Sequence, residues 1–463
     1  MSPRERLILA GIVLAGLAVR AVLSVSVPLL DGETYYWVWS KTPALSYLDH
    51  PPFLAYLIRV TTVLGDGEVW VRLGPLLAGV LTPLALFTLG REMFGVCAGL
   101  IAAGIFQVVP VLTGAGLFAT PETPLFLWWS LSLVCVRRAL WGNPRWWIPA
   151  GAAVGLGMLS KMTMIILPLG VLGFILTRRR KVLRSSWLDL GVAIALVLFA
   201  PVLIWNAGNG WATARFILHE RPQQVPVGPA GLLAITIEQL AFAIALAPAL
   251  LWMIVPVLRR RRDDRMAFLL WMILPTLALL CAVVWVWGAA HGYWAGPAYL
   301  GLAVALGGLW PGRPAALAMG MNAAFIAYAA LLPLLPVLPA PPGTVESVAG
   351  WHDVARRAEE LAAGLPNPVV YVVDHFEGAA QFSYHTLRRH TVTIPKPFNG
   401  SVWRSPSQVP IASAVWIVAS EWQPTARPEE FFVHVVARET LPIVVRGREV
   451  RRFKFWTASG ARP

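Results

Sequence analysis

The chain has 463 residues, of which 57% are hydrophobic and only 13% are charged. Because soluble domains carry roughly a quarter charged residues, this composition excludes a protein that is soluble over its whole length. The net charge of +14 does not indicate a nucleic-acid partner, because the basic residues gather in short segments between apolar runs. Cys97, Cys135 and Cys281 lie in or beside apolar runs without metal-ligand spacing, so we interpret them as packing residues.

Apolar runs of about the length that crosses a bilayer recur along the chain, and we predict about eleven transmembrane helices. The first run follows Arg4 and Arg6 and has no small-residue cleavage site after it, so it is interpreted as a retained span rather than a signal peptide. The predicted spans are 7–26, 73–91, 96–116, 124–140, 147–160, 162–177, 187–205, 231–257, 267–287, 295–310 and 315–336.

Basic residues mark every second connection between these spans. Arg137, Arg138 and Arg145 lie in one such connection, and the runs 178–184 and 259–262 lie in two others. The positive-inside rule places these connections, Arg313 and the N-terminus in the cytoplasm. An odd number of spans then places the residues after about 340 on the outer face.

The composition changes near residue 339, which predicts two domains, a membrane domain over 1–338 and an outer domain over 339–463. Pro339 to Gly343 forms the predicted linker, and a domain of about 120 residues is an ordinary size. The fold class is therefore a polytopic α-helical membrane protein followed by a small α/β domain. Its predicted elements are a helix over 351–365, strands over 369–373, 414–418 and 431–436, and an edge strand over 451–456.

The segment 27–72 is predicted to be a long outer loop that is rich in aromatic and acidic residues. Asp31 and Glu33 follow the first span directly, where carboxylates can reach a lipid headgroup; a solvated loop with an aromatic belt is the alternative. Further along, Asp49 and His50 precede two prolines, which restrict the backbone before them and hold the pair in place. This pair is a candidate for binding a metal ion or a hydrogen-bonding ligand.

Two charged residues stand close to the apolar runs themselves. Glu122 lies between two predicted spans and next to Pro121, where a carboxylate is a functional-site hypothesis by default; a simple turn cap is the alternative. Lys161 lies near the outer end of a crowded apolar region, where a cation costs about 3 kcal/mol. It therefore needs a phosphate or an acid as a partner, unless it extends to the surface.

Arg72 and Arg221 also lie in outer segments and favour a phosphate ligand. His291 is either an interface residue or a ligand contact.

Several motifs match a known family. The run from Tyr35 to Ser40, the run from Leu45 to Pro52, Thr120 to Leu125 and Gly155 to Lys161 resemble the bacterial relatives of protein O-mannosyltransferases. These relatives include the aminoarabinose transferases of lipid A and belong to glycosyltransferase family 39 of the glycosyltransferase C (GT-C) superfamily. The chain departs from the family in two places. The family usually has Asp-Glu before Ala-Tyr-Tyr where this chain has Gly32-Glu33, with an acid one place earlier, and it has Asp at the position of Glu122.

The resemblance implies an inverting transfer of a sugar from a polyprenyl phosphate to a lipid, glycan or protein acceptor at the outer face of the bacterial inner membrane. Asp31 or Glu33 would be the catalytic base, and Glu122 would orient the acceptor or bind a divalent ion with Asp49 or His50. The residues implied in binding the donor phosphate are Lys161, Arg72 and Arg221, and those implied in other substrate contacts are Tyr35, Tyr36, Asp49, His50 and His291. The dependence on a metal ion stays open.

A flippase or transporter of lipid-linked sugars is the alternative function from another class. Transporters often contain internal repeats and broken helices at the middle of the bilayer. This chain has no internal repeat, and its informative acids gather at the outer ends of spans. The sequence therefore favours an enzyme that acts at the membrane surface.

Overall fold

The computed structural model describes residues 1–220, 225–243, 254–288, 290–309, 312–331, 348–387, 390–395, 402–420, 424–445 and 447–462. The chain forms two compact units. The helical unit contains residues 1–25, 49–54 and 72–331, and the α/β unit contains residues 26–48, 55–71 and 332–463. Each unit is described by itself below.

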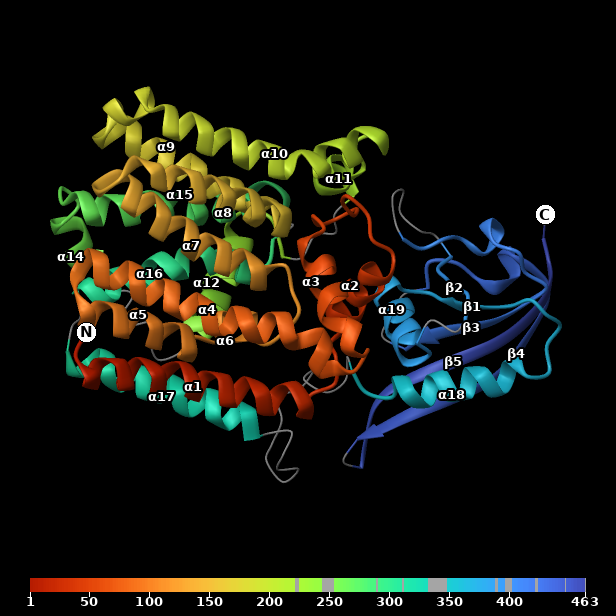
Figure 1. Ribbon diagram of the computed structural model, residues 1–463. Coiled ribbons are helices and arrows are strands. Elements are labelled where there is room, and N and C mark those ends of the chain that lie inside the picture. Colours follow the sequence, from red (N-terminus) through yellow and green to blue (C-terminus); the bar gives the residue numbers. More distant parts are fainter. Residues whose placement is uncertain are drawn as a thin grey trace. The chain divides into compact units, whose positions relative to one another are not determined.

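The helical unit is built from helices that lie roughly side by side (Figure 1). Within the described residues, every predicted span falls on helical structure. The longer helices are α1 (Pro3–Ser26), α4 (Glu68–Phe94), α5 (Val96–Val108), α7 (Glu122–Trp141), α8 (Trp147–Ser160), α9 (Ile166–Arg178), α10 (Ser186–Gly208), α12 (Pro229–Ala243), α15 (Asp264–Trp287), α16 (Gly296–Leu309) and α17 (Arg313–Leu331). The shorter ones are α6 (Pro110–Ala115), α11 (Ala212–Arg215) and α14 (Ile254–Arg259).

Two predicted spans differ in detail from the structure. The span predicted over 96–116 is divided into α5 and α6, because Pro110 cannot donate the backbone hydrogen bond that would continue the helix. The span predicted over 231–257 begins as α12 and ends as α14, and residues 244–253 lie outside the described residues.

Four of the described helices are long and apolar enough to cross a membrane: α1, α4, α10 and α15. Others are shorter, such as α8 with 14 residues. In α10 many apolar side chains remain exposed, including Leu196, Val197 and Ile204. Apolar surface of this extent needs lipid around it rather than water, so the helical unit belongs in a membrane.

The basic connections predicted from charge meet at one end of the helical unit. Arg137 and Arg138 at the end of α7 bond the carboxylate of Glu92 at 2.9 Å and 2.7 Å. Arg265 at the start of α15 donates to the carbonyl of Met93 at 2.7 Å. Because Glu122 is the first residue of α7 and Arg138 lies in its last turn, Glu122 lies at the opposite end of the unit.

The α/β unit contains a five-stranded sheet with the order β2-β1-β3-β5-β4. Its strands are β1 (Val369–Val373), β2 (Val392–Thr393), β3 (Ser413–Ala419), β4 (Phe432–Val445) and β5 (Arg448–Ala461). The strands β1, β2 and β3 are parallel, and β4 and β5 form an antiparallel hairpin on β3. Helices α18 (Trp351–Ala362) and α19 (Phe376–His385) contact this sheet. The predicted edge position of 451–456 is wrong, because β5 lies between β3 and β4.

The segment that the sequence predicts as a long loop is largely helical. It forms α2 (Asp31–Lys41) and α3 (Phe53–Thr61), and most of it belongs to the α/β unit. Aromatic packing fixes α2: the ring of Tyr47 stacks on Trp39 at 4.2 Å, and its hydroxyl donates to the Trp39 carbonyl at 2.8 Å. Burial raises the pKa of Tyr47 to about 12, so this hydroxyl stays protonated and remains a donor.

Candidate active site

Glu122 and Lys161 form an ion pair between their side chains. Glu122 begins α7 after Pro121, and Lys161 follows the last residue of α8, so both lie at helix ends. Their exposed fractions are 8% and 5%, which excludes most water from the pair. The acid partner that Lys161 requires at this depth is therefore Glu122.

Two aromatic rings lie beside the ammonium group of Lys161. Its Nζ atom is 5.3 Å from the ring centroid of Tyr293 and 5.6 Å from that of Trp294. Both rings come from the short helical turn Gly292–Ala295, in the connection between α15 and α16. His291, a predicted substrate contact in the same turn, stacks on Tyr293 at 4.9 Å. The structure thus brings this connection to the ion pair.

Helix α12 fixes the turn that carries these rings. The backbone N–H of Gly292 donates to Glu238 at 3.0 Å, and Gln239 donates to the Gly292 carbonyl at 2.9 Å. The hydroxyl of Tyr299 lies 3.2 Å from the Oε1 atom of Gln239. Two side chains of α12 therefore bind both polar groups of one glycine and set the position of the rings over Lys161.

Replacing Gly292 with alanine is expected to lower turnover by roughly 10- to 100-fold, because small displacements of a positioned group have effects of this size. The new Cβ atom would lie 2.5 Å from Glu238 Cδ and 2.7 Å from Gln239 Nε2, so the ends of these side chains have to shift, which disturbs their hydrogen bonds to the turn. Gly208→Ala is the control, since a Cβ atom there meets nothing within 4 Å. Steady-state rates of the two variants in the same lipid check this, and equal rates would contradict it.

The other predicted phosphate ligands do not join this pair in the described residues. Arg72 is fully buried, donates to the Ser24 carbonyl at 3.2 Å and lies over the ring of Phe118. The hydrogen bond to Ser24 ties the start of α4 to the end of α1. Arg221 lies outside the described residues. Asp49 and His50 are half-buried. They lie just before α3, in the segment 49–54, which belongs to the helical unit.

The two candidate bases on α2 have different surroundings. Glu33 is fully buried, and its Oε2 atom accepts a hydrogen bond from the Leu30 N–H at 3.0 Å, which caps the start of the helix. Asp31 is half-buried, and its Oδ1 atom accepts from Gln381 at 2.9 Å. The capping contact gives Glu33 a structural task, whereas Asp31 is partly exposed to solvent.

Tyr35 and Tyr36 are both buried in an aromatic cluster on α2. The Tyr35 ring contacts Trp39 at 4.7 Å and Phe376 of α19 at 5.1 Å, and the Tyr36 ring contacts Trp39 at 5.1 Å. The Tyr-Tyr-Trp motif is therefore explained by the packing of its rings. A contact between either tyrosine hydroxyl and the substrate stays a prediction.

No group of three or more His, Cys, Asp or Glu side chains is arranged to hold a metal ion among the described residues. The predicted metal ligands Asp49, His50 and Glu122 therefore do not form such a group, and Glu122 is paired with a cation instead. A requirement for a divalent ion stays a prediction, and we derive no step through one.

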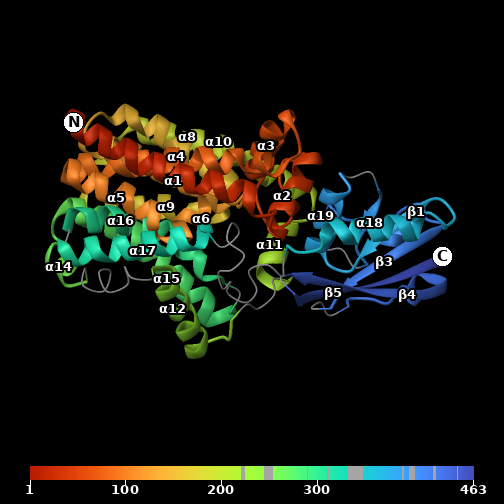
Figure 2. The same ribbon diagram turned by 90° about the horizontal axis from the view of Figure 1, so that it is seen from below.

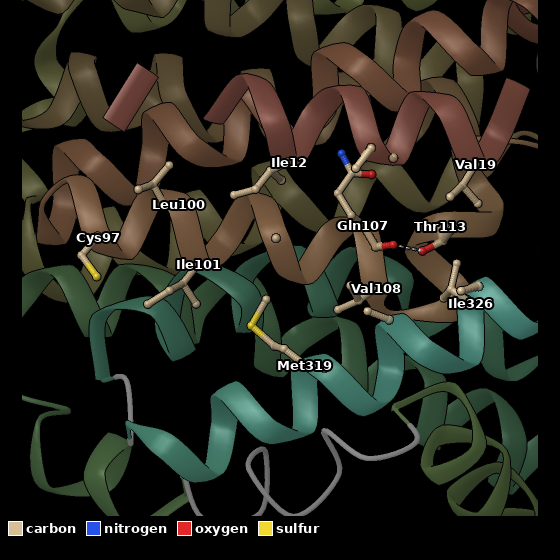
Figure 3. A pocket seen from close by; sticks show the side chains of 16 residues that line it. Ile12, Val19, Cys97, Leu100, Ile101, Gln107, Val108, Thr113, Met319 and Ile326 are labelled. Carbon is tan, nitrogen blue, oxygen red and sulfur yellow. Dashed lines mark hydrogen bonds between the residues drawn. The ribbon is translucent and has the colours of Figure 1, made fainter. Parts of the chain in front are cut away.

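A cavity of about 520 Å³ lies elsewhere in the helical unit, between α1, α5 and α17 (Figure 3). Its lining is mostly apolar and includes Ile12, Leu100 and Met319. Gln107 lines it as well, and its Oε1 atom accepts a hydrogen bond from Arg20 at 2.6 Å. None of the candidate site residues lines this cavity, so it is separate from the ion pair.

Comparison with known proteins gives a family match. Residues 49–205 match the family described as dolichyl-phosphate-mannose-protein mannosyltransferase. The lipid A galacturonosyltransferase RgtD of Rhizobium johnstonii is 24% identical over 92% of this chain and 96% of its own length. The putative mannosyltransferase YycA of Bacillus subtilis is 26% identical over 36% of this chain and 24% of its own length.

Solved structures share the fold. ArnT from Cupriavidus metallidurans bound to undecaprenyl phosphate has a TM-score of 0.64 and 16% identity, and the match covers 96% of this chain and 97% of ArnT. The oligosaccharyltransferase of Archaeoglobus fulgidus in its apo form has a TM-score of 0.52 and 14% identity, over 88% of this chain and 69% of that one. At these identities the likeness shows the fold.

The multi-helix fold with a small α/β unit is shared with ArnT, and the matched family and relatives are glycosyltransferases, so the chain is a membrane glycosyltransferase. The family match and the relative that is similar over 92% of the chain agree with the motifs around Tyr35 and Asp49, which predict a glycosyltransferase.

Proposed function

We propose that this protein transfers a sugar from a polyprenyl-phosphate donor to an envelope lipid, with inversion at the anomeric carbon. The observation that carries the proposal is the buried pair of Glu122 and Lys161 at helix ends, beside two aromatic rings, in a chain that shares the fold of ArnT. A lipid donor is supported by the structural likeness to ArnT, which was solved with undecaprenyl phosphate. A lipid acceptor is supported by the relative described as a lipid A galacturonosyltransferase.

Lys161 is the proposed phosphate-binding cation. As the bond between the anomeric carbon and the phosphate oxygen breaks, negative charge grows on the departing polyprenyl phosphate. A preorganised cation in a site that excludes water stabilises this charge strongly. The role of Glu122 is to hold Lys161 in place, and the rings of Tyr293 and Trp294 add favourable interactions with the same ammonium group.

Asp31 is the proposed base. A hydroxyl group of the acceptor loses its proton to the Asp31 carboxylate as its oxygen attacks the anomeric carbon. Attack opposite to the departing phosphate inverts the configuration at this carbon. Asp31 suits this role better than Glu33, because Glu33 is fully buried and caps α2.

We further propose that eleven spans cross the membrane and that the N-terminus lies in the cytoplasm. The clustering of Arg137, Arg138 and Arg265 at one end of the helical unit supports this topology, because basic residues favour the cytoplasmic side. In this orientation Glu122 and Lys161, at the other end of α7, belong to the outer side, and residues 348–462 lie in the periplasm or outside the cell.

The test is a reconstituted reaction of the purified full-length protein with a synthetic polyprenyl-phosphate sugar and the lipid extract of the parent cells. Mass spectrometry is expected to show one glycosyl increment on an envelope lipid and the release of polyprenyl phosphate. The double variant Lys161→Met/Glu122→Gln is the inactive control. If neither the lipids nor the donor change in mass with several donor sugars, the proposed function is wrong.

A further inference from the structure

Helix α19 of the C-terminal segment lies beside α2, and both belong to the α/β unit (Figures 1 and 2). Three side chains of α19 contact α2 or the segment after it. The ring of Phe376 packs on Tyr35 at 5.1 Å, the hydroxyl of Tyr384 donates to the Asp66 carbonyl at 3.0 Å, and the amide of Gln381 bonds the start of α2. The two helices are thus fixed to each other at several points.

The contacts of Gln381 differ in kind from the other two. Its Nε2 atom donates to the Oδ1 atom of Asp31 at 2.9 Å and to the carbonyl of Leu29 at 3.0 Å. An amide nitrogen has two N–H groups, so these contacts use both donors. Gln381 is only 1% exposed, so water cannot easily replace either hydrogen bond if the amide is removed.

This geometry holds one carboxylate in a defined orientation. The Leu29 carbonyl lies two residues before the helix, and Asp31 is its first residue, so one buried amide ties the carboxylate to the backbone that enters α2. A neutral amide donor binds a carboxylate less strongly than a lysine or arginine cation does. It therefore leaves the carboxylate more basic than a cation would. A general base needs both a fixed position and sufficient basicity.

We propose that Gln381 is a positioning residue for the base Asp31, and that the C-terminal segment contributes to catalysis through this contact. The inference rests on the proposed function, in which Asp31 accepts the proton of the acceptor hydroxyl. It assigns a catalytic task to α19 that the sequence motifs do not indicate. The family match does not reach this helix, because it covers residues 49–205.

The test compares Gln381→Met, which keeps an unbranched side chain without donors, with Tyr384→Phe as a matched control. Gln381→Met removes the hydrogen bonds to Asp31 and to the Leu29 carbonyl, whereas Tyr384→Phe removes the one from α19 to the Asp66 carbonyl and leaves Asp31 untouched. We expect Gln381→Met to lower kcat by roughly 10- to 100-fold with KM changed by less than about 3-fold, because the base acts in the chemical step. Tyr384→Phe is expected to keep kcat within about 3-fold of the parent protein.

A second measurement separates positioning from general loss of structure. In an Asp31→Asn background, Gln381→Met should reduce the residual kcat by less than about 2-fold, because the group through which it acts is gone. If the role of Gln381 is purely structural, Gln381→Met should lower kcat by the same factor in the parent protein and in Asp31→Asn. If Gln381→Met lowers the yield of folded protein, Gln381→Leu serves in its place, since its side chain also has no donor, and the same loss of kcat is expected.

The outcomes distinguish this inference from the proposed function. If Asp31→Asn keeps full activity, the assignment of the base is wrong. If Asp31→Asn is inactive while both Gln381 variants keep the parent kcat, the positioning role is overturned and the proposed function stands. Equal losses in Gln381→Met and Tyr384→Phe would also overturn the positioning role.

Discussion

Replacing Lys161 with methionine is expected to lower both turnover and stability. Turnover should fall by roughly 10²- to 10³-fold, the loss seen when one preorganised group that stabilises developing charge is removed. Stability should fall by about 3–5 kcal/mol, because the substitution leaves the carboxylate of Glu122 buried without its cation. Both quantities are measured on the purified protein, by sugar transfer and by thermal unfolding in the same detergent.

The double variant Lys161→Met/Glu122→Gln separates the two effects. It removes both charges of the pair, so most of the lost stability should return, while turnover stays low because no cation meets the phosphate. Arg138→Met is the control at the other end of the same helix, where Arg137 still binds Glu92 and transfer should be unaffected. Recovery of transfer in the double variant would show that Lys161 serves only to neutralise Glu122.

The arrangement of helices could be predicted largely from the sequence, because each apolar run has to bury its backbone polar groups in a helix. The run 187–205, for example, lies within α10. The segment 27–72 was not predicted correctly. It lacks a long apolar run, and α2 has only 11 residues. Helices of this length are stabilised mainly by tertiary packing, here by the rings around Trp39, which a local pattern does not reveal.

The candidate site could be predicted only in part. The position of Lys161 in an apolar region shows that it needs a partner, but the sequence does not show which acid lies beside it, because Glu122 is 39 residues away on another helix. Glu238 gave a signal that the sequence analysis missed, since an acid within a predicted span is a functional hypothesis by default. Gln381 gave none: it is 350 residues from Asp31, and a glutamine on a short helix is usually a surface residue.

The pair Asp31→Asn and Glu33→Gln tests which carboxylate on α2 is the base. Asp31→Asn keeps the size of the side chain and removes its basicity, so kcat should fall by roughly 10²- to 10⁴-fold, the contribution of general base catalysis. Glu33→Gln should keep kcat within about 3-fold, because the amide oxygen still accepts the hydrogen bond from the Leu30 N–H and caps the helix.

This comparison matters because the family motif, with its two adjacent acids, does not decide between them. The acid at the family's usual position is replaced by Gly32, which cannot act as a base, and the carboxylate of Asp31 comes one residue earlier on the helix. Each variant is assayed for sugar transfer at saturating donor, with thermal unfolding as the measure of the fold. If Glu33→Gln is inactive at unchanged unfolding temperature while Asp31→Asn is active, the base is Glu33 and its contact with Leu30 must break when substrate binds.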